Sequence, residues 1–157
     1  MRKHILYNTA ICVLLVGFLL AGCEKDKGKG AGESVNVPFT TIAQGDLFGG
    51  GREGFTKQNI IISTATDWEN LKTAMPDNMV ESFAETDIDF SVYQIIAVFD
   101  EVKPNGGWSI DVMSITQVAN KIVVTLSNVK TGDDTCVITQ PFHIVKIPIS
   151  QKEIVFQ

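Results

Sequence analysis

The stretch from Val92 to Phe99 reads VYQIIAVF and decides the fold. Gln94 is its only polar residue, and most of the others are β-branched or aromatic, which favours strands. A continuous apolar run of this length, rather than an alternating one, is typical of a strand that is covered on both faces. We therefore predict a central strand over residues 92–99 with a packed layer on each side.

The residues that follow this run predict a hairpin. Apolar and polar residues alternate over 108–112, and the alternation slips by one position at 113–115, which indicates a bulge. A second alternating segment, 122–126, comes after a short turn at 119–120. Two alternating segments separated by a tight turn are expected to pair as antiparallel neighbours.

Three more segments are expected to extend the β structure. Residues 35–39 alternate as a half-buried strand, and the proline among them favours a sheet edge. Residues 59–63 are expected to form another strand, preceded by a loop or hairpin tip over 45–54 that holds five glycines. Residues 137–147 give a last strand region, bent at Pro141.

One helix is predicted between these strands. Residues 66–69 read Thr-Asp-Trp-Glu, which resembles a capping box, where each end residue satisfies a free backbone N–H of the other. The apolar residues after it share one helical face, and they are Trp68, Leu71 and Met75. Pro76 is expected to end the helix, because the residue before a proline avoids the α region.

Together these elements predict a mainly β domain. We expect an antiparallel β-sandwich or a barrel-like sheet with one short helix at about residues 66–75. The domain is expected to span residues 35–157. Residues 23–34 before it hold glycines and charges but no large apolar residue, which predicts a flexible tether.

The first 22 residues have the three parts of a secretory signal peptide. Residues 2–4 are basic, residues 11–20 are almost wholly apolar, and Leu20-Ala21-Gly22-Cys23 ends the segment with small residues before a cysteine. This ending resembles the bacterial lipobox, which implies cleavage before Cys23 and acyl chains such as palmitate on that residue. The alternative is an uncleaved membrane helix, but Asn8-Thr9 interrupts its apolar run.

A lipid anchor at Cys23 predicts a place outside the cytoplasm, in the bacterial cell envelope, either periplasmic or surface-exposed. Two or more acyl chains hold a protein stably on a membrane. Without Arg2 and Lys3 the chain keeps 11 basic and 18 acidic residues, a net charge of −7. Because phosphate backbones repel an acidic domain, we expect no nucleic-acid partner.

The chain after Cys23 offers few groups for catalysis. It contains a single histidine, His143, and a single further thiol, Cys136, whose odd spacing points them to opposite faces of a regular strand. We expect Cys136 to be a small core residue and His143 a hydrogen-bonded strand histidine. The acidic pairs at 87/89 and 133/134 are expected in solvated turns. We predict no catalytic residue, no metal site and no cofactor.

Several motifs in the second half of the chain occur in an order that suggests a family. They lie at residues 60–63, 67–71, 88–90, 103–110 and 139–148. Over about 90 residues, Ile60 to Ile149, the chain resembles the C-terminal domain of the PrcB family, lipoproteins named after an accessory subunit of a secreted protease complex. It departs at the turn, where Asn105 and Trp108 stand in place of the usual threonine and tyrosine.

The segment Asn105-Gly106-Gly107-Trp108 is the candidate interaction loop. Its Asn-Gly-Gly sequence tolerates the positive φ angles of a tight hairpin turn. Two alternatives stay open for Trp108: it packs on the sheet, or the loop displays it with Asn105 to a partner.

The function predicted from these observations is that of a non-catalytic envelope lipoprotein. Its domain is expected to act as an accessory or interaction module for another envelope protein, and the family resemblance implies a secreted protease. The alternative is a domain that binds a small ligand or a glycan, with Trp108 or Trp68 as a stacking surface. An exposed Trp108 beside a concave polar pocket favours the ligand, whereas a protruding apolar tip favours a protein.

Overall fold

The computed structural model describes residues 34–157. The predicted signal peptide, the lipid site at Cys23 and the tether up to residue 33 lie outside the described residues. The elements run in the order β1 (Ser34–Asn36), β2 (Thr40–Leu47), β3 (Gln58–Ile62), α1 (Ala65–Ala74), α2 (Asp77–Val80), β4 (Tyr93–Phe99), β5 (Asp111–Val118), β6 (Lys121–Ser127), β7 (Gln140–Pro148) and β8 (Glu153–Phe156). Neither helix in residues 34–157 is long and apolar enough to cross a bilayer.

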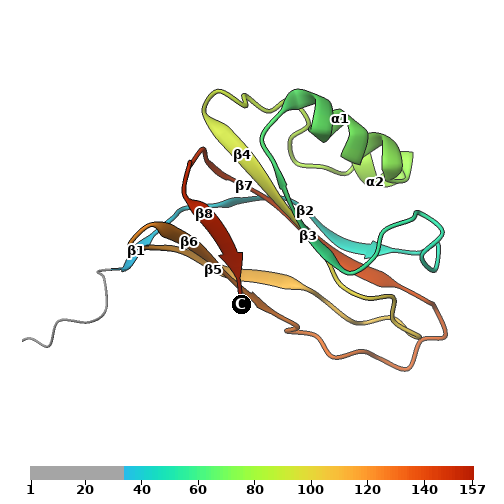
Figure 1. Cartoon of the computed structure of the whole chain (residues 1–157). Helices are drawn as coiled ribbons and strands as arrows, with labels where there is room; N and C mark the ends of the chain where they lie inside the picture. Colours follow the sequence, from blue (N-terminus) through green and yellow to red (C-terminus); the bar gives the residue numbers. More distant parts are fainter. Residues whose placement is uncertain (1–33) are drawn as a thin grey trace, which may run out of the picture. The chain divides into compact units, whose positions relative to one another are not determined.

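The strands form two four-stranded sheets that pack face to face (Figure 1). One sheet has the order β1-β5-β6-β8, and the other has the order β2-β7-β4-β3. Neighbouring strands are antiparallel except β6 and β8, which are parallel. Neither sheet closes on itself, so the predicted β-sandwich is confirmed and the barrel-like alternative does not hold.

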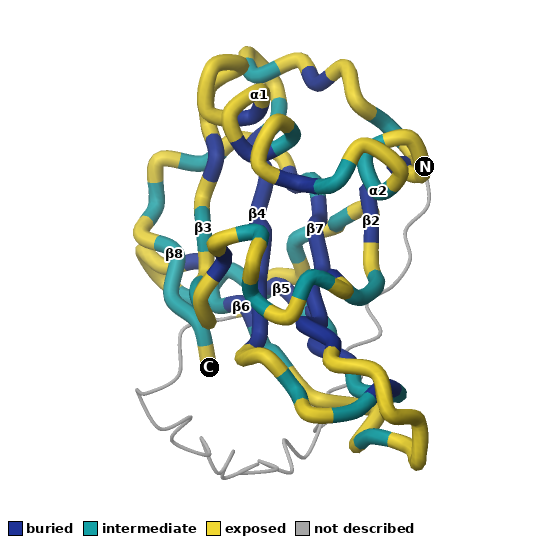
Figure 2. Tube along the Cα trace, turned by 90° about the vertical axis from the view of Figure 1, so that its right-hand side faces the viewer, coloured by how far each residue is buried: buried dark blue, intermediate teal, exposed yellow. Residues whose placement is uncertain are grey.

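β4 lies inside its sheet, with core on both faces. Ile96 and Val98 face the other sheet and pack in the core between the two sheets. Ile95, Ala97 and Phe99 face the opposite way and pack in a second core beneath the helices. Figure 2 shows β4 and its neighbour β7 as the most continuously buried strands. The predicted central strand, covered on both faces, is confirmed.

The predicted helix is present as α1, but its cap differs from the prediction. The N-cap is Thr64, whose extended backbone lets its Oγ1 accept a hydrogen bond of 3.1 Å from the backbone N of Asp67. The expected cap, Thr66, lies inside the first turn instead. Trp68 is buried on the sheet as predicted. The helix stops before Pro76, which confirms the predicted end.

The predicted hairpin of β5 and β6 is confirmed with its irregularity. The register shifts between Val112 and Ser114, at the predicted bulge. The turn at residues 119–120 places Ala119 at φ 51°, in the left-handed region. β8, which the sequence patterns did not predict, adds to β6 from the C-terminus.

The first predicted strand was wrong in its extent. Residues 35–39 do not form one strand, because the chain passes from one sheet to the other there. β1 ends at Asn36 and pairs with β5, and β2 begins at Thr40 and pairs with β7. Val37 and Phe39 pack into the core between the sheets during this crossing.

Candidate functional site: the loop end of the sandwich

Three long loops lie together at one end of the sandwich, which we call the loop end. They are residues 48–57 between β2 and β3, 100–110 between β4 and β5, and 128–139 between β6 and β7. Figure 1 shows all three on the right of the molecule. Loops on a rigid sheet scaffold are the common place for binding residues in sandwich proteins.

The second and third loops pair with each other. Isolated bridges join Lys103 to Thr139 and Trp108 to Thr131. Between them, the backbone N of Asp133 donates to the carbonyl oxygen of Gly106 at 2.9 Å. The candidate interaction loop is therefore not a hairpin that pairs with itself. It turns as predicted, with Gly107 at φ 71°, but it pairs with a loop about 25 residues further along the chain.

Asp100 connects all three loops through its buried carboxylate. Its side chain is 1% exposed and lies 3.0 Å from Lys57 Nζ of the first loop and 3.0 Å from Lys103 Nζ of the second. Asn128 Nδ2 of the third loop donates to it at 2.8 Å. Burial alone would raise the pKa of Asp100, but the lysines, Asn128 and a backbone N–H lower it to about 2.

Asn105 makes three hydrogen bonds within the loop end. Its Nδ2 donates to the carbonyl oxygen of Asp133, and its Oδ1 accepts a hydrogen bond of 2.8 Å from Trp108 Nε1. Thr139 Oγ1 donates to the Asn105 carbonyl oxygen at 2.9 Å. Asn105 thus fixes the orientation of the tryptophan and joins two loops.

Trp108 is half-buried and packs directly on Gly132. A Cβ atom on Gly132 would lie 2.7 Å from the indole ring, so only glycine fits there. Lys103 Nζ lies 4.9 Å from the ring centroid, within the range of a cation–π contact. Trp108 therefore has a packing role, and the rest of its surface lines a pocket.

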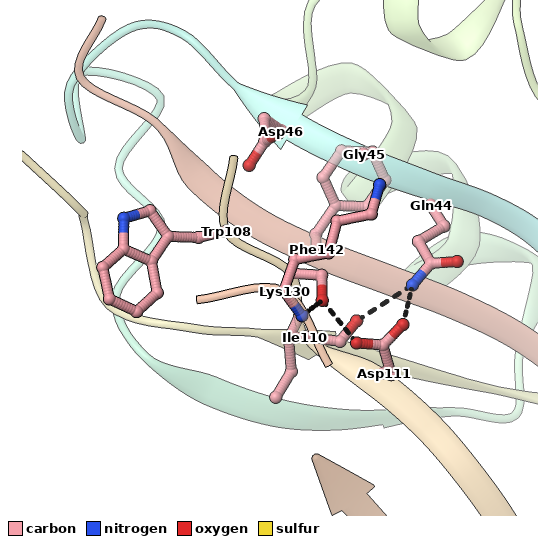
Figure 3. A pocket seen from close by; sticks show the side chains of 9 residues that line it. Gln44, Gly45, Asp46, Trp108, Ile110, Asp111, Lys130 and Phe142 are labelled. Atoms are coloured by element: carbon pink, nitrogen blue, oxygen red, sulfur yellow. Dashed lines mark hydrogen bonds between the residues drawn. The ribbon is translucent and has the colours of Figure 1, made fainter. Parts of the chain in front are cut away.

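This pocket has a volume of about 200 Å³, and Figure 3 shows the side chains that line it. Trp108, Asp46, Lys130, Gln44 and Phe142 contribute to its wall. Burial raises the pKa of Asp46, while Lys130 lowers it and Asp133 raises it further. Asp46 Oδ1 is buried with no hydrogen-bond partner among residues 34–157. An unpaired buried acceptor of this kind can receive a donor from a polar ligand.

Hydrogen bonds hold the floor of the pocket in place. Asp111 accepts hydrogen bonds from Gln44 Nε2 at 2.7 Å and from Ser109 Oγ at 2.5 Å. His143 lies behind it, accepting the backbone N–H of Val112 on Nδ1 at 3.0 Å. Burial lowers the pKa of His143 and favours the neutral ring, although Asp111 opposes this shift. In the neutral ring, Nδ1 is the acceptor because it receives the backbone N–H of Val112. The predicted hydrogen-bonded strand histidine is confirmed.

Part of the outer surface of the loop end is apolar, although the sequence patterns gave no sign of this. Four large apolar side chains are exposed there, and we call them the apolar tip: Phe48 (63%), Val102 (41%), Val137 (45%) and Ile138 (52%). A depression of about 440 Å³ lies among Phe48, Arg52 and Ile138. A Cβ at Gly51 would lie 3.3 Å from Val102, and one at Gly50 would lie 3.6 Å from Ile138. The tip therefore brings together side chains from all three loops.

Cys136 lines the same depression and is exposed. The prediction that it is a small core residue was wrong. That prediction rested on the usual behaviour of a free cysteine, which packs as a small apolar residue. β7 begins only at Gln140, and residues 128–139 form a loop on the surface.

The two acidic pairs lie in solvated turns, as predicted. Asp89 accepts hydrogen bonds from Ser91, and Asp133 accepts them from Thr135. These bonds lower the pKa values of both aspartates. No group of three metal-ligating side chains occurs within the described part of the chain.

Comparison with known proteins adds no family to this picture. No protein-family model, curated protein or solved structure matches the chain.

Proposed function

We propose that the chain is a non-catalytic lipoprotein of the bacterial cell envelope, anchored through Cys23, whose domain binds a partner protein at its loop end. The observation that carries this proposal is the apolar tip. Five of the ten large apolar side chains exposed on the described residues lie in the three loops of that end, and four of these five form the apolar tip. Clustered exposed apolar residues of this kind are typical of protein interaction sites.

Ion pairs and hydrogen bonds join the loops beneath the tip to one another. Asp100 joins all three of them, and Asn105 joins the second to the third. A surface that is already fixed in its binding shape loses less conformational entropy on association. Phe48 has the properties of an interface anchor, because aromatic side chains are enriched where binding energy concentrates.

The resemblance to the PrcB family supports an accessory role and gives the partner a class. On this proposal the partner is a secreted protease of the same envelope, which the domain assists or restrains. The signal peptide and the lipobox of residues 1–23 would place this chain on the same side of the membrane as a secreted protease.

Capture of a partner from envelope extract tests the role of the tip. The full lipidated chain is compared with Phe48→Ser and Ile138→Ser, both of which reduce the apolar tip without touching the core. Met113→Ser is the matched control, since Met113 is 53% exposed on β5 and belongs to none of the three loops. We expect the two tip variants to lose one specific captured protein at least tenfold and the control to retain it. Equal capture by all four proteins would contradict the proposal.

A second candidate function is supported by the pocket beside Trp108. Trp108, Asp46 and Lys130 are an aromatic, an acceptor and a donor, the combination that a small polar ligand or a glycan fragment needs. Titration of a glycan panel, followed by tryptophan fluorescence, tests this alternative. Binding that is lost in Asp46→Asn but kept in Phe48→Ser would assign the ligand to the pocket, and no response to any glycan would exclude glycans.

A further inference from the structure

The four edge strands of the two sheets differ in how well they are protected against pairing. β1 is only three residues long, β2 has a register shift between Thr41 and Ala43, and the charged Glu153 of β8 pairs with Lys121. Short strands, bulges and charges are the usual means by which edges avoid further pairing. β3 has none of them: it reads QNIII and pairs with β4 in unbroken register.

The outer edge of β3 carries free backbone groups. Among residues 34–157, the backbone of Gln58–Ile62 hydrogen-bonds only with β4, and no side chain contacts it by a hydrogen bond. Every second residue of such a strand therefore directs its N–H and C=O outward, in the plane of the sheet. The natural partner of that row of donors and acceptors is another extended segment.

A groove runs along this same edge, between β3 and α1. It has a volume of about 450 Å³ and a largely apolar lining that includes Phe55, Ile60, Ile62, Leu71 and Ala74. Only two residues separate the end of β3 from the start of α1, so the start of the helix lies at the Ile62 end of the groove. In Figure 1, α1 lies at the upper right, and β3 runs below it through the middle of the molecule.

The single charged residue of the groove lining is Asp67, at the end next to Ile62. Its carboxylate is solvent-exposed and accepts a hydrogen bond from Thr64 Oγ1. The groove therefore combines a strand edge, an apolar channel and one negative charge at a fixed end. The negative charge of Asp67 favours a basic residue in the part of a bound segment that lies next to it.

We propose that this groove binds an extended peptide segment of a partner protein, which adds to β3 as an antiparallel strand. Its backbone pairs with the free edge, and alternate apolar side chains lie against Ile60 and Leu71. In the antiparallel orientation the residue beside Asp67 is N-terminal to those apolar residues. The segment that fits best is thus a basic residue followed by alternating apolar and small polar residues.

A second copy of the chain fits the groove less well than a peptide does. Its own β3 would bring Ile62, but that side chain is only 2% exposed because α1 already covers it. Its nearest cation, Lys57, is already paired with Asp100. A free peptide brings side chains that are not yet buried and a cation that is not yet paired.

A library of short acetylated peptides tests the proposal, with lysine followed by alternating valine or leucine and threonine. Binding to the mature protein is measured by fluorescence polarisation, and the contact site is measured by amide chemical shifts. We expect shifts confined to β3 and α1, with slowed hydrogen exchange in residues 58–62. Ala74→Arg, which fills the groove, should weaken binding at least tenfold. Thr73→Arg adds the same charge to α1 outside the groove lining and should leave binding unchanged.

Two further comparisons make the result decisive. Asp67→Asn should abolish the preference for lysine over serine at the first peptide position, while the apolar positions keep their effect. Phe48→Ser should not alter peptide binding, so a failure of the loop-end proposal does not affect this one. The proposal is overturned if no library member binds, if the shifts lie away from β3, or if sedimentation shows that β3 instead pairs with a second copy.

Discussion

Removing the charge of Asp100 should destabilise the domain by about 2–3 kcal/mol at neutral pH. The magnitude follows from the lowering of its pKa from 3.8 to about 2, because one pKa unit corresponds to about 1.4 kcal/mol. Lys57, the backbone N–H of Glu101, Lys103 and Asn128 lower this pKa together, so the loss in Asp100→Asn should be shared among these partners. Lys57 is 67% exposed and solvent screens its pair, so the loss should lie toward the lower end of this range.

The pH dependence of this loss has a definite sign. The folded-state pKa of Asp100 lies below its unfolded value, so its contribution is complete above about pH 4 and disappears as the pH falls through about 2. Wild type and Asp100→Asn should therefore differ in unfolding free energy at pH 7 and converge near pH 2.

Urea denaturation followed by tryptophan fluorescence measures the difference at each pH. Asp134→Asn is the matched control, because Asp134 is exposed in the same loop end and should change stability by less than about 0.5 kcal/mol. A loss below about 1 kcal/mol at pH 7 would refute the reasoning, and so would a difference that persists unchanged at pH 2.

Three further experiments test the loop end and the anchor. Gly107→Val should lower the free energy of unfolding by about 2 kcal/mol or more, because Gly107 has φ 71° and a Cβ there would lie 2.6 Å from the Asp133 carboxyl carbon. Thermal melts measure this loss, and a variant that melts like wild type would exclude the positive φ at Gly107. Cys136 should react with a thiol reagent in the native protein at a rate close to that of a free peptide, whereas reaction only after unfolding would place it in the core. In the bacterium, intact-mass analysis should find acyl chains on Cys23 and none after Cys23→Ala; an unmodified Cys23 in the wild-type protein would disprove the lipid anchor.

The elements that could be predicted from the sequence are those with a strong local pattern. The apolar run of β4, the phase slip in β5 and the proline after α1 each determine structure through their immediate neighbours, and each was found where expected. The cap of α1 was misplaced by two residues, because Thr64 and Thr66 are equally good caps in sequence and the backbone of the preceding turn decides between them.

The loop end could not be predicted, because its structure depends on contacts between distant residues. Asp100 looks like an ordinary loop acid, and its partners Lys57 and Asn128 lie 43 and 28 residues away along the chain. Cys136 was placed in the core because a free cysteine usually packs as a small apolar residue, and the last strand was expected to start at residue 137 because Val137 and Ile138 are apolar. In the structure those two side chains are exposed at the apolar tip, because consecutive apolar residues in an exposed loop have the same sequence pattern as the start of a strand.

Site-specific photo-crosslinking in the bacterium tests the central claim most directly. A photoreactive phenylalanine analogue is placed at Phe48 on the apolar tip, and in a separate strain at Met113 on β5 as the control. We predict that the Phe48 position crosslinks to one envelope protein of defined mass, and that the Met113 position does not. Crosslinks of equal pattern at both positions, or none at Phe48 under conditions where the protein is folded and anchored, would contradict a partner-binding loop end.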